Sequence, residues 1–539
     1  MNVVSFVPLG FDGELVSVEV DLRHGLPGTE IVGLPGAAVR EARERIRVAL
    51  ANSGFVYPPL RILVNLSPAD VPKFGAGFDL AIAVALLCRS GQIPSTIKGP
   101  TLAIGELLLD GSVRPARGVL SGVAVAYRSG ISHFTVAREG FREAQAFGKG
   151  RIAAVSHLRD LRSAFLDSPT KLEETEEPGI ETSNVGSSKL ELGTVASGAT
   201  EIVPNFRDMR GRPVLKRACE IAAAGRHNLL LSGPPGCGKT MAAERLFGLC
   251  PDLSHEQAVE VARIYSTAGL FQKEIQNSRR PPVRAPHHTA SAEGMIGGGR
   301  YLAPGELSLA HNGILILDEA PEFRRSVLQG LREPLEKGLV RLIRAERRYW
   351  YPADIQLLMT ANACPCGNNG ALGRRCLCSL SEIHNYRKRL GAALLDRVEI
   401  RVWQAEEAGA GQVVGEGSQI TLGGRGSSAP VDAADAADEG SSEVMSARVH
   451  AAVACQEGRY RAFPFERNGR VPGALLRRLV NATSSAEAVL NAAVPKLGLS
   501  SRAVDAILRV ARTIADIDGD DSVGSSSMME AIQLRRDDR

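Results

Sequence analysis

Residues 228–240 read NLLLSGPPGCGKT, an apolar run followed by a glycine-rich turn. The spacing Gly-x-x-x-x-Gly-Lys-Thr is typical of a phosphate-binding loop, in which glycines let backbone N–H groups turn toward the phosphates of a nucleotide. The three leucines predict a buried strand before the loop, and residues 241–249 predict a helix after it. A strand, a glycine-rich loop and a helix in this order favour a nucleotide site over an accidental turn.

The side chains of this loop have distinct expected roles. Lys239 can reach the β- and γ-phosphates, Thr240 can ligate Mg²⁺, and the N-terminus of the following helix attracts negative charge. We therefore predict ATP and Mg²⁺ as cofactors. The expected nucleotide-binding residues are Gly233, Pro234, Pro235, Gly236, Cys237, Gly238, Lys239 and Thr240.

Two further apolar runs end in polar residues. Residues 314–319, ILILDE, predict a strand after which Asp318 holds Mg²⁺ and Glu319 polarises an attacking water. Residues 357–362, LLMTAN, predict another strand, whose Asn362 can orient that water or contact the γ-phosphate. The two carboxylates can also cap a helix, but a phosphate-binding loop earlier in the chain favours the catalytic interpretation.

Length and composition indicate a soluble protein with about three domains. The chain has 539 residues, of which 44% are hydrophobic, and a formal net charge of +4, which permits nucleic-acid binding without arguing for it. Residues 78–88 form the longest apolar run, shorter than the roughly 18 residues that span a bilayer. The N-terminus lacks the pattern of a secretory signal. We therefore expect a cytoplasmic protein with no membrane partner.

Changes of composition along the chain predict the domain organisation. Residues 1–167 alternate between strand and helix patterns and predict a mixed α/β domain. Residues 168–201, acidic and then rich in Gly, Ser and Thr, and residues 405–442, rich in Gly, Ala, Ser and Asp, predict flexible segments. Between them, residues 202–404 form the expected ATPase core, and residues 443–539 predict a helical domain.

A basic hairpin is predicted over residues 338–352. Its strands carry four arginines beside a tryptophan: Arg341, Arg344, Arg347, Arg348 and Trp350. Basic and aromatic residues together can follow a nucleic-acid backbone and stack on bases. A solvated hairpin tip is an equally good interpretation of the same pattern.

Four of the nine cysteines lie close together in one loop rich in Gly and Asn. Cys364, Cys366, Cys376 and Cys378 form a C-x-C, nine-residue, C-x-C pattern. Four thiolates fit a tetrahedral, structural Zn²⁺ site, although this spacing is tighter than the usual C-x-x-C. Reduced structural thiols are the alternative.

Several longer stretches resemble the Mg-chelatase-like AAA+ ATPases of the YifB/ComM family. They are residues 25–55, 61–87, 105–126 and 280–320, beginning GLPGTEIVGLPG, RILVNLSPADVP, GELLLDGSVRPA and RPPVRAPHHTAS. The resemblance implies an AAA+ core, a helical C-terminal lid and an N-terminal domain similar to the proteolytic domain of Lon. It also implies that Arg397 is an arginine finger for the nucleotide of a neighbouring subunit and that Arg502 is a second sensor in the lid. Surface ion pairs are the alternative for both arginines.

The Lon-like domain is expected to be non-proteolytic. Lon-type proteases use a serine-lysine pair, and Gly77 stands about where the resemblance places the serine. Lys73 is then expected to be a solvated or binding residue.

The motifs predict an α/β multidomain ATPase, and the family resemblance implies that it forms a homo-hexameric ring. The resemblance also leads us to expect that it couples ATP hydrolysis to translocation or branch migration of single-stranded or branched DNA in recombination or natural transformation. The alternative is a Mg-chelatase-like ATPase that drives metal insertion by, or remodelling of, a partner protein. A Lon-like protease is disfavoured by Gly77.

Overall fold

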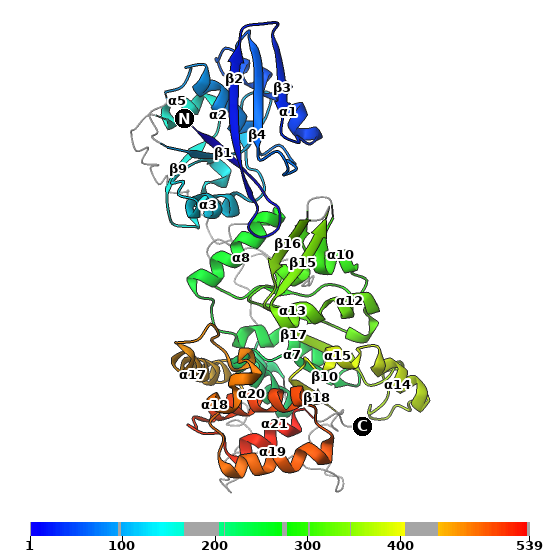
Figure 1. Ribbon diagram of the computed structural model, residues 1–539. Coiled ribbons are helices and arrows are strands. Elements are labelled where there is room, and N and C mark those ends of the chain that lie inside the picture. The colour runs from blue at the N-terminus through cyan, green and yellow to red at the C-terminus, as the bar shows by residue number, and fades with distance from the viewer. Residues whose placement is uncertain are drawn as a thin grey trace.

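The structure is a computed structural model, and it shows an N-terminal α/β domain, a central core and a C-terminal helical region in succession (Figure 1). It describes residues 2–94, 99–165, 204–209, 211–271, 278–299, 302–344, 347–404 and 440–535. The expected flexible segment 168–201 lies outside the described residues. So does the second one, 405–442, except for its last three residues, which lead into a helix.

The N-terminal domain is built on a seven-stranded mixed sheet, as its alternating pattern predicts. In spatial order the strands are β3 (Gly28–Val32), β4 (Arg61–Ser67), β2 (Glu14–Arg23), β1 (Val3–Val7), β5 (Thr101–Ile104), β8 (His133–Ala137) and β9 (Arg151–Val155). Strand β1 pairs antiparallel with β2 and parallel with β5. Strands β2 and β4 are also antiparallel, whereas the pairs β3–β4, β5–β8 and β8–β9 are parallel. A small ribbon pairs β6 (Glu106–Leu107) with β7 (Val113–Arg114).

Five helices accompany this sheet: α1 (Ala37–Asn52), α2 (Asp79–Arg89), α3 (Val119–Arg128), α4 (Phe141–Gln145) and α5 (Leu161–Ala164). Helix α2 corresponds to the longest apolar run of the sequence and is buried along almost its whole length. It packs on both β2 and α1, which explains why it is apolar all round.

Lys73 is buried, so of the two expectations for it, a solvated or a binding residue, the solvated one was wrong. Its side chain is fully enclosed, and its ammonium donates to the carbonyl of Pro68. Burial lowers the pKa of Lys73. The backbone of Lys73 also bonds with Leu34 and Gly36, so the residue fastens two loops of the domain together.

The central core contains a sheet of five parallel strands. Their order is β11 (Val283–Arg284), β14 (Ile314–Leu317), β17 (Gln356–Asn362), β10 (Leu229–Gly233) and β18 (Ile400–Trp403). Because the strands are parallel, all their carboxyl ends lie at one edge of the sheet. The three apolar runs of the sequence are the neighbouring strands β14, β17 and β10, so the polar residues that follow them are brought to the same edge.

The remaining elements of the core surround this sheet. Its helices are α6 (Pro213–Gly225), α7 (Lys239–Leu246), α8 (His255–Ala268), α10 (Ala292–Ile296), α11 (Glu306–Leu309), α12 (Arg325–Gly330), α13 (Arg332–Lys337), α14 (Leu380–Lys388) and α15 (Ala392–Leu395). Two ribbons pair β12 (Gly297–Gly298) with β13 (Ala303–Pro304), and β15 (Leu339–Arg344) with β16 (Arg347–Pro352). The second is the predicted hairpin, and its Val340, Leu342 and Tyr351 are buried.

The C-terminal region is helical, as predicted. Its helices are α17 (Ser442–Tyr460), α18 (Gly473–Leu479), α19 (Ser484–Leu497), α20 (Ser501–Asp518) and α21 (Ser525–Gln533). The apolar face of α20 is buried, and both α17 and α20 pack on α6 of the core. The helical region and the core sheet therefore share one hydrophobic interior, in which Ile507 and Leu358 belong to the same cluster.

The N-terminal domain contacts the core through helix α8, which α3 packs against, and through the hairpin (Figure 1). The buried guanidinium of Arg263 on α8 lies 3.9 Å from the ring centre of Phe11 and 3.4 Å from a carboxylate oxygen of Asp12. The backbone N–H of Phe11 donates to the carbonyl of Trp350, at 2.9 Å. The two domains are thus joined by a cation–π contact, an ion pair and hydrogen bonds.

Among the described residues, every helix is too short or too polar to span a lipid bilayer.

Candidate functional site

The phosphate-binding loop joins the carboxyl end of β10 to the N-terminus of α7. Gly236 and Gly238 adopt φ angles of +83° and +91°, which strain any residue with a side chain. A Cβ atom at Gly233 would lie 2.2 Å from the carbonyl oxygen of Gln404, a distance that no side chain tolerates. The backbone conformation of the loop and its packing against the residue after β18 therefore require glycines at these three positions.

Lys239 turns back over the loop that precedes it. Its ammonium donates to the carbonyls of Gly233 at 2.8 Å and Pro234 at 2.9 Å, and lies 3.3 Å from Oδ1 of Asn362. The side chain is almost completely buried, so its charge acts where water screens it little. An ammonium held at this point can exchange backbone carbonyls for phosphate oxygens.

Asp318 lies between two hydroxyl groups. Its Oδ1 accepts from Oγ1 of Thr360 at 2.5 Å and from Oγ1 of Thr240 at 3.4 Å. The hydroxyl of Thr240 and this carboxylate are the hard oxygen ligands that Mg²⁺ prefers. Sequence reasoning missed Thr360. The signal for it is its place on β17 two residues before Asn362, because alternate residues of a strand point to the same side.

Glu319 and Asn362 meet beside Lys239. The amide nitrogen of Asn362 lies 3.5 Å from Oε1 of Glu319, and the backbone N–H of Glu319 donates to Oγ1 of Thr360 at 3.0 Å. Glu319 has a φ angle of +52°, a left-handed conformation that costs a non-glycine residue roughly 1–3 kcal/mol and concentrates at functional sites. The structure therefore brings the carboxylate, the amide and the ammonium to one edge of the sheet.

This set of groups fits Mg²⁺-nucleotide chemically. A glycine loop and a helix N-terminus face the same point as one ammonium, one hydroxyl and two carboxylates. Of the predicted site residues, the structure brings together Lys239, Thr240, Asp318, Glu319 and Asn362.

Arg397 and Arg502 lie at the opposite edge of the sheet. The carbonyl of Arg397 accepts from the side chain of Asn228, which directly precedes β10, whereas the phosphate-binding loop follows that strand. Five strand residues separate the two edges by roughly 15 Å. The guanidinium of Arg397 pairs with Glu336, and that of Arg502 lies 3.6 Å from the same carboxylate. In a single chain, both arginines thus form the ion pair that was the alternative to their catalytic roles.

A cavity of about 680 Å³ also lies at this amino-end edge, between the core sheet and the residues that follow α17. Arg226, Arg467 and Arg470 line it together with Asp354. Asp354 pairs with Arg470 at 2.7 Å and with Arg226 at 3.4 Å. Burial alone would raise the pKa of Asp354, but the two arginines outweigh it and hold that pKa well below its usual value. We interpret these charges as an internal ion network that joins the core to the helical region.

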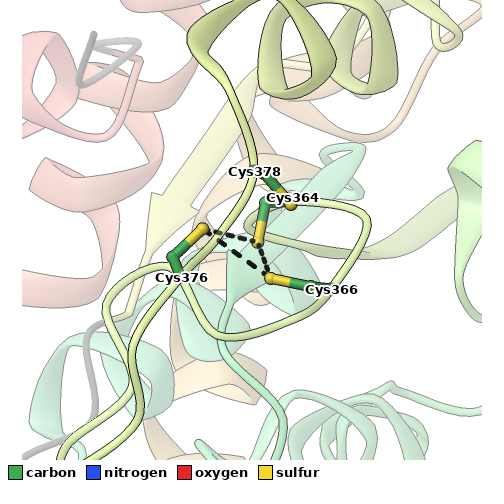
Figure 2. A group of neighbouring side chains, drawn as sticks. All are labelled: Cys364, Cys366, Cys376 and Cys378. Carbon is green, nitrogen blue, oxygen red and sulfur yellow. Dashed lines mark hydrogen bonds between the residues drawn. The ribbon is translucent and has the colours of Figure 1, made fainter.

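The four predicted cysteines converge in one loop between β17 and α14 (Figure 2). Their sulfur atoms all lie within 4.8 Å of one another, and Cys364 is buried while Cys366 is exposed. The donor set is sulfur alone, which suits Zn²⁺ in a structural rather than a catalytic role.

The hairpin β15–β16 presents its basic and aromatic residues partly to the N-terminal domain. Arg347 pairs with Asp70, and the ring of Trp350 lies 5.4 Å from that of Phe11. Arg348 lies exposed on the same strand. The tryptophan therefore has a packing role that the sequence pattern did not reveal, although part of its side chain remains accessible.

Comparison with known proteins places most of the chain in one group. Models of magnesium chelatase subunit ChlI match residues 18–140 and 205–410, and a model of the ChlI C-terminal region matches residues 439–535. A weaker similarity, 24% identity over 170 residues, links 29% of the chain with 21% of Lon protease 2 of Herpetosiphon aurantiacus.

Several relatives resemble the chain over nearly its whole length. Protein YifB of Salmonella typhimurium is 38% identical over 98% of this chain and 96% of its own. Competence protein ComM of Haemophilus influenzae is 36% identical over 99% of this chain and 97% of its own. The chain therefore belongs to the Mg-chelatase-like AAA+ family that includes YifB and ComM.

Proposed function

We propose that this protein is a Mg²⁺-dependent ATPase that works as a ring and moves DNA. The observation that carries the ATPase assignment is the convergence of Lys239, Thr240, Asp318, Glu319 and Asn362 at the carboxyl ends of β10, β14 and β17. Each of these side chains is of a type that phosphoryl transfer to water uses, and their convergence supports the assignment.

In this proposal each residue has one task. Lys239 leaves the loop carbonyls to neutralise charge on the β- and γ-phosphates, and Thr240 and Asp318 hold Mg²⁺, which bridges phosphate oxygens. Glu319 orients the attacking water and accepts its proton. Asn362, placed between Lys239 and Glu319, positions both the terminal phosphate and the water.

The ring follows from where the arginines lie. Arg397 and Arg502 sit at the edge of the sheet opposite the phosphate-binding loop of their own chain. A guanidinium that stabilises charge on the leaving phosphoryl group must come within a few ångströms of it. We therefore assign both arginines to the nucleotide of a neighbouring copy, which makes an oligomer the active form. A homo-hexameric ring is the form we propose, because the chain belongs to an AAA+ family.

DNA is the proposed substrate of the motor. A relative that matches nearly the whole chain is named a competence protein, and the hairpin carries arginines beside Trp350. Single-stranded or branched DNA suits such a surface, because phosphates bind arginine and bases stack on an aromatic ring.

The second candidate is a chelatase-type function, in which ATP turnover drives metal insertion by, or remodelling of, a partner protein. Its specific support is that three models of the ChlI subunit match the chain. In that case hydrolysis should respond to a protein partner and not to DNA.

The test is the ATPase rate of the purified chain with Mg²⁺, alone and with single-stranded or branched DNA, at low salt. We expect hydrolysis that DNA stimulates and that a Glu319→Gln variant lacks. A hydrolysis rate that neither form of DNA changes would refute the motor function and favour a protein partner. A chain that binds no ATP would refute the ATPase assignment itself.

A further inference from the structure

The four-cysteine loop touches the nucleotide site. We propose that Cys364, Cys366, Cys376 and Cys378 bind one Zn²⁺ whose role is to hold the phosphate-binding loop and Asn362 in their working positions. This inference rests on the ATPase function proposed above, because it assigns the metal a role in that same site.

The positions of the sulfur atoms are close to those of four ligands around a tetrahedrally coordinated metal ion. Cys364 lies 3.3 Å from Cys366 and 3.7 Å from Cys376, and Cys366 and Cys376 are also 3.7 Å apart, sulfur to sulfur (Figure 2). Four thiolates around Zn²⁺, with bonds of about 2.3 Å, place their sulfurs roughly 3.8 Å apart. Small shifts therefore suffice for coordination, and Cys378 completes the set.

The loop has little else to order it. Residues 363–379 contain neither helix nor strand, and Leu372 and Leu377 are exposed. Uninterrupted loops of this length are uncommon in compact domains and are usually functional. A metal ion that joins both ends of this segment can stabilise it in place of an apolar core.

One part of this loop packs directly on the phosphate-binding loop. Gly367, one residue after Cys366, is buried and has a φ angle of +78°. A Cβ atom added there would lie 3.0 Å from Cγ and 3.2 Å from Cδ of Pro235. The backbone beside the cysteines is therefore in close contact with Pro235, the third residue of the phosphate-binding loop.

Both flanks of the cysteine loop also reach the site. Cys364 follows Asn362 by two residues, so a ligand bond to its sulfur restrains the strand end that carries the sensor amide. Cys378 directly precedes Ser379, whose hydroxyl accepts from the backbone of Glu382 and begins α14. On that helix Tyr386 is buried, and burial, followed by the charges of Glu322 and Glu319, raises its pKa to about 12.

The ion would thus tie three parts of the catalytic site together: the end of β17, the phosphate-binding loop and α14. Removing it frees residues 363–379 and, with them, the wall against Pro235. A displacement of about 1 Å at a catalytic group can cost roughly 100-fold in rate. The metal is a positioning device, since its four ligands are all protein sulfurs and none of its positions is open to substrate.

The first experiment measures metal in the purified full chain by mass spectrometry and its affinity for a fluorescent ATP analogue. We expect one zinc per chain in the wild type and none in a Cys376→Ser/Cys378→Ser variant, which should bind the analogue at least about tenfold more weakly. The control is Cys455→Ser, which removes an exposed thiol elsewhere and should keep both zinc and affinity.

A matched pair of glycine variants tests the contact without touching a ligand. Gly367→Ala pushes a methyl group against Pro235, whereas Gly373→Ala, with a φ angle of +69° in the same loop, meets nothing within 4 Å. Both carry the same kind of backbone strain, so only the contact differs. We expect both to keep zinc and only Gly367→Ala to lose affinity for the analogue, by about tenfold.

The outcomes are separable. A wild-type chain without zinc refutes the metal site, even if it hydrolyses ATP. Zinc in the wild type with unchanged nucleotide affinity in both the double serine variant and Gly367→Ala refutes the positioning role. A wild-type chain that binds zinc but no nucleotide refutes the proposed ATPase function instead. If the double serine variant unfolds, the Gly367→Ala and Gly373→Ala pair still decides the positioning role.

Discussion

Glu336 on α13 pairs with Arg397 of the core, and the same carboxylate lies 3.6 Å from Arg502 at the start of α20. One carboxylate therefore holds together the two arginines that were expected to act on nucleotide. A hydrogen bond and the charge of Arg397 lower the pKa of Glu336, so the carboxylate stays ionised at neutral pH. Glu336 is half-exposed, so water screens its ion pairs with the two arginines and weakens them.

Replacing either arginine should abolish hydrolysis without abolishing ATP binding. Arg397→Ala and Arg502→Ala leave the phosphate-binding loop intact, so the affinity for a fluorescent ATP analogue should stay within about twofold while kcat falls by roughly 10³-fold. Arg478→Ala, an exposed arginine on α18, is the control and should hydrolyse normally. Loss of nucleotide binding in Arg397→Ala would mean that the residue acts on its own chain.

Two residues of the site should separate binding from chemistry. Lys239→Ala removes the ammonium that faces the phosphates and should eliminate ATP binding. Glu319→Gln keeps the shape of the side chain but cannot accept a proton, so ATP should bind normally and turn over at least about 100-fold more slowly. Equilibrium binding and steady-state hydrolysis measured on both variants check this, and normal turnover by Glu319→Gln would remove Glu319 from the mechanism.

Thr360 should be needed for hydrolysis although no sequence motif marks it. Its hydroxyl donates to Asp318 and accepts from the backbone of Glu319. Thr360→Val has nearly the same shape and loses both bonds, so we expect kcat to fall by about tenfold or more and the Mg²⁺ requirement to rise. Thr360→Ser restores the hydroxyl and should restore the rate. An equal loss in both variants would indicate a packing defect.

Acid should loosen the contact between the core and the helical region. His227 is buried, its Nε2 lies 2.8 Å from Oγ1 of Thr513, and burial lowers its pKa to about 3. An unfolded histidine has a pKa near 6.5 and binds more protons, so the stabilisation is complete above pH 6.5. It should decline by about 1.4 kcal/mol per pH unit as the pH falls below that value.

Urea unfolding at pH 7.5 and 5.5 measures this effect. The wild type should lose stability between the two values, and His227→Gln, which has no group titrating in this range at that position, should lose about 1.4 kcal/mol less. The same pH dependence in both proteins would assign acid sensitivity to other groups.

The contact between the N-terminal domain and the hairpin should be visible by fluorescence. Trp350 is one of two tryptophans in the chain, and its ring lies 5.4 Å from Phe11, which also contacts Arg263. Phe11→Ala should expose Trp350 and shift its emission to longer wavelength. Replacing a phenylalanine outside the contact, as in Phe147→Ala, should leave the emission unchanged. An unshifted Phe11→Ala spectrum would show that the domains are not held at this point.

The catalytic edge could be predicted from sequence because its chemistry is local. The conformations of Gly236 and Gly238 and the charge of Lys239 can be predicted from one short motif, and each apolar run lies within one strand. Parallel pairing then brings Asp318 and Asn362 together without further information. The hairpin followed in the same way, since its alternating pattern matches the buried face of β15 and β16.

Tertiary contacts explain what the sequence could not show. The sequence predicts that Lys73 is solvated. In the structure its side chain is buried, and its ammonium donates a hydrogen bond to the carbonyl of Pro68, five residues earlier in the chain. Trp350 reads as a free aromatic residue until Phe11, more than 300 positions away, is placed against it. Glu336 on α13 pairs with both Arg397 and Arg502 because α13 lies close to the start of α20. No local sequence pattern predicts this contact.

The central claim is that the catalytic site is completed between copies of this chain, and a mixing experiment tests it most directly. Lys239→Ala chains lack the nucleotide site but keep Arg397, whereas Arg397→Ala chains keep the site but lack the arginine. Each protein alone should be inactive, and co-expressed chains should hydrolyse ATP well above the sum of the two, because some interfaces then contain both residues. Mixed assemblies that remain as inactive as the separate proteins would contradict the account.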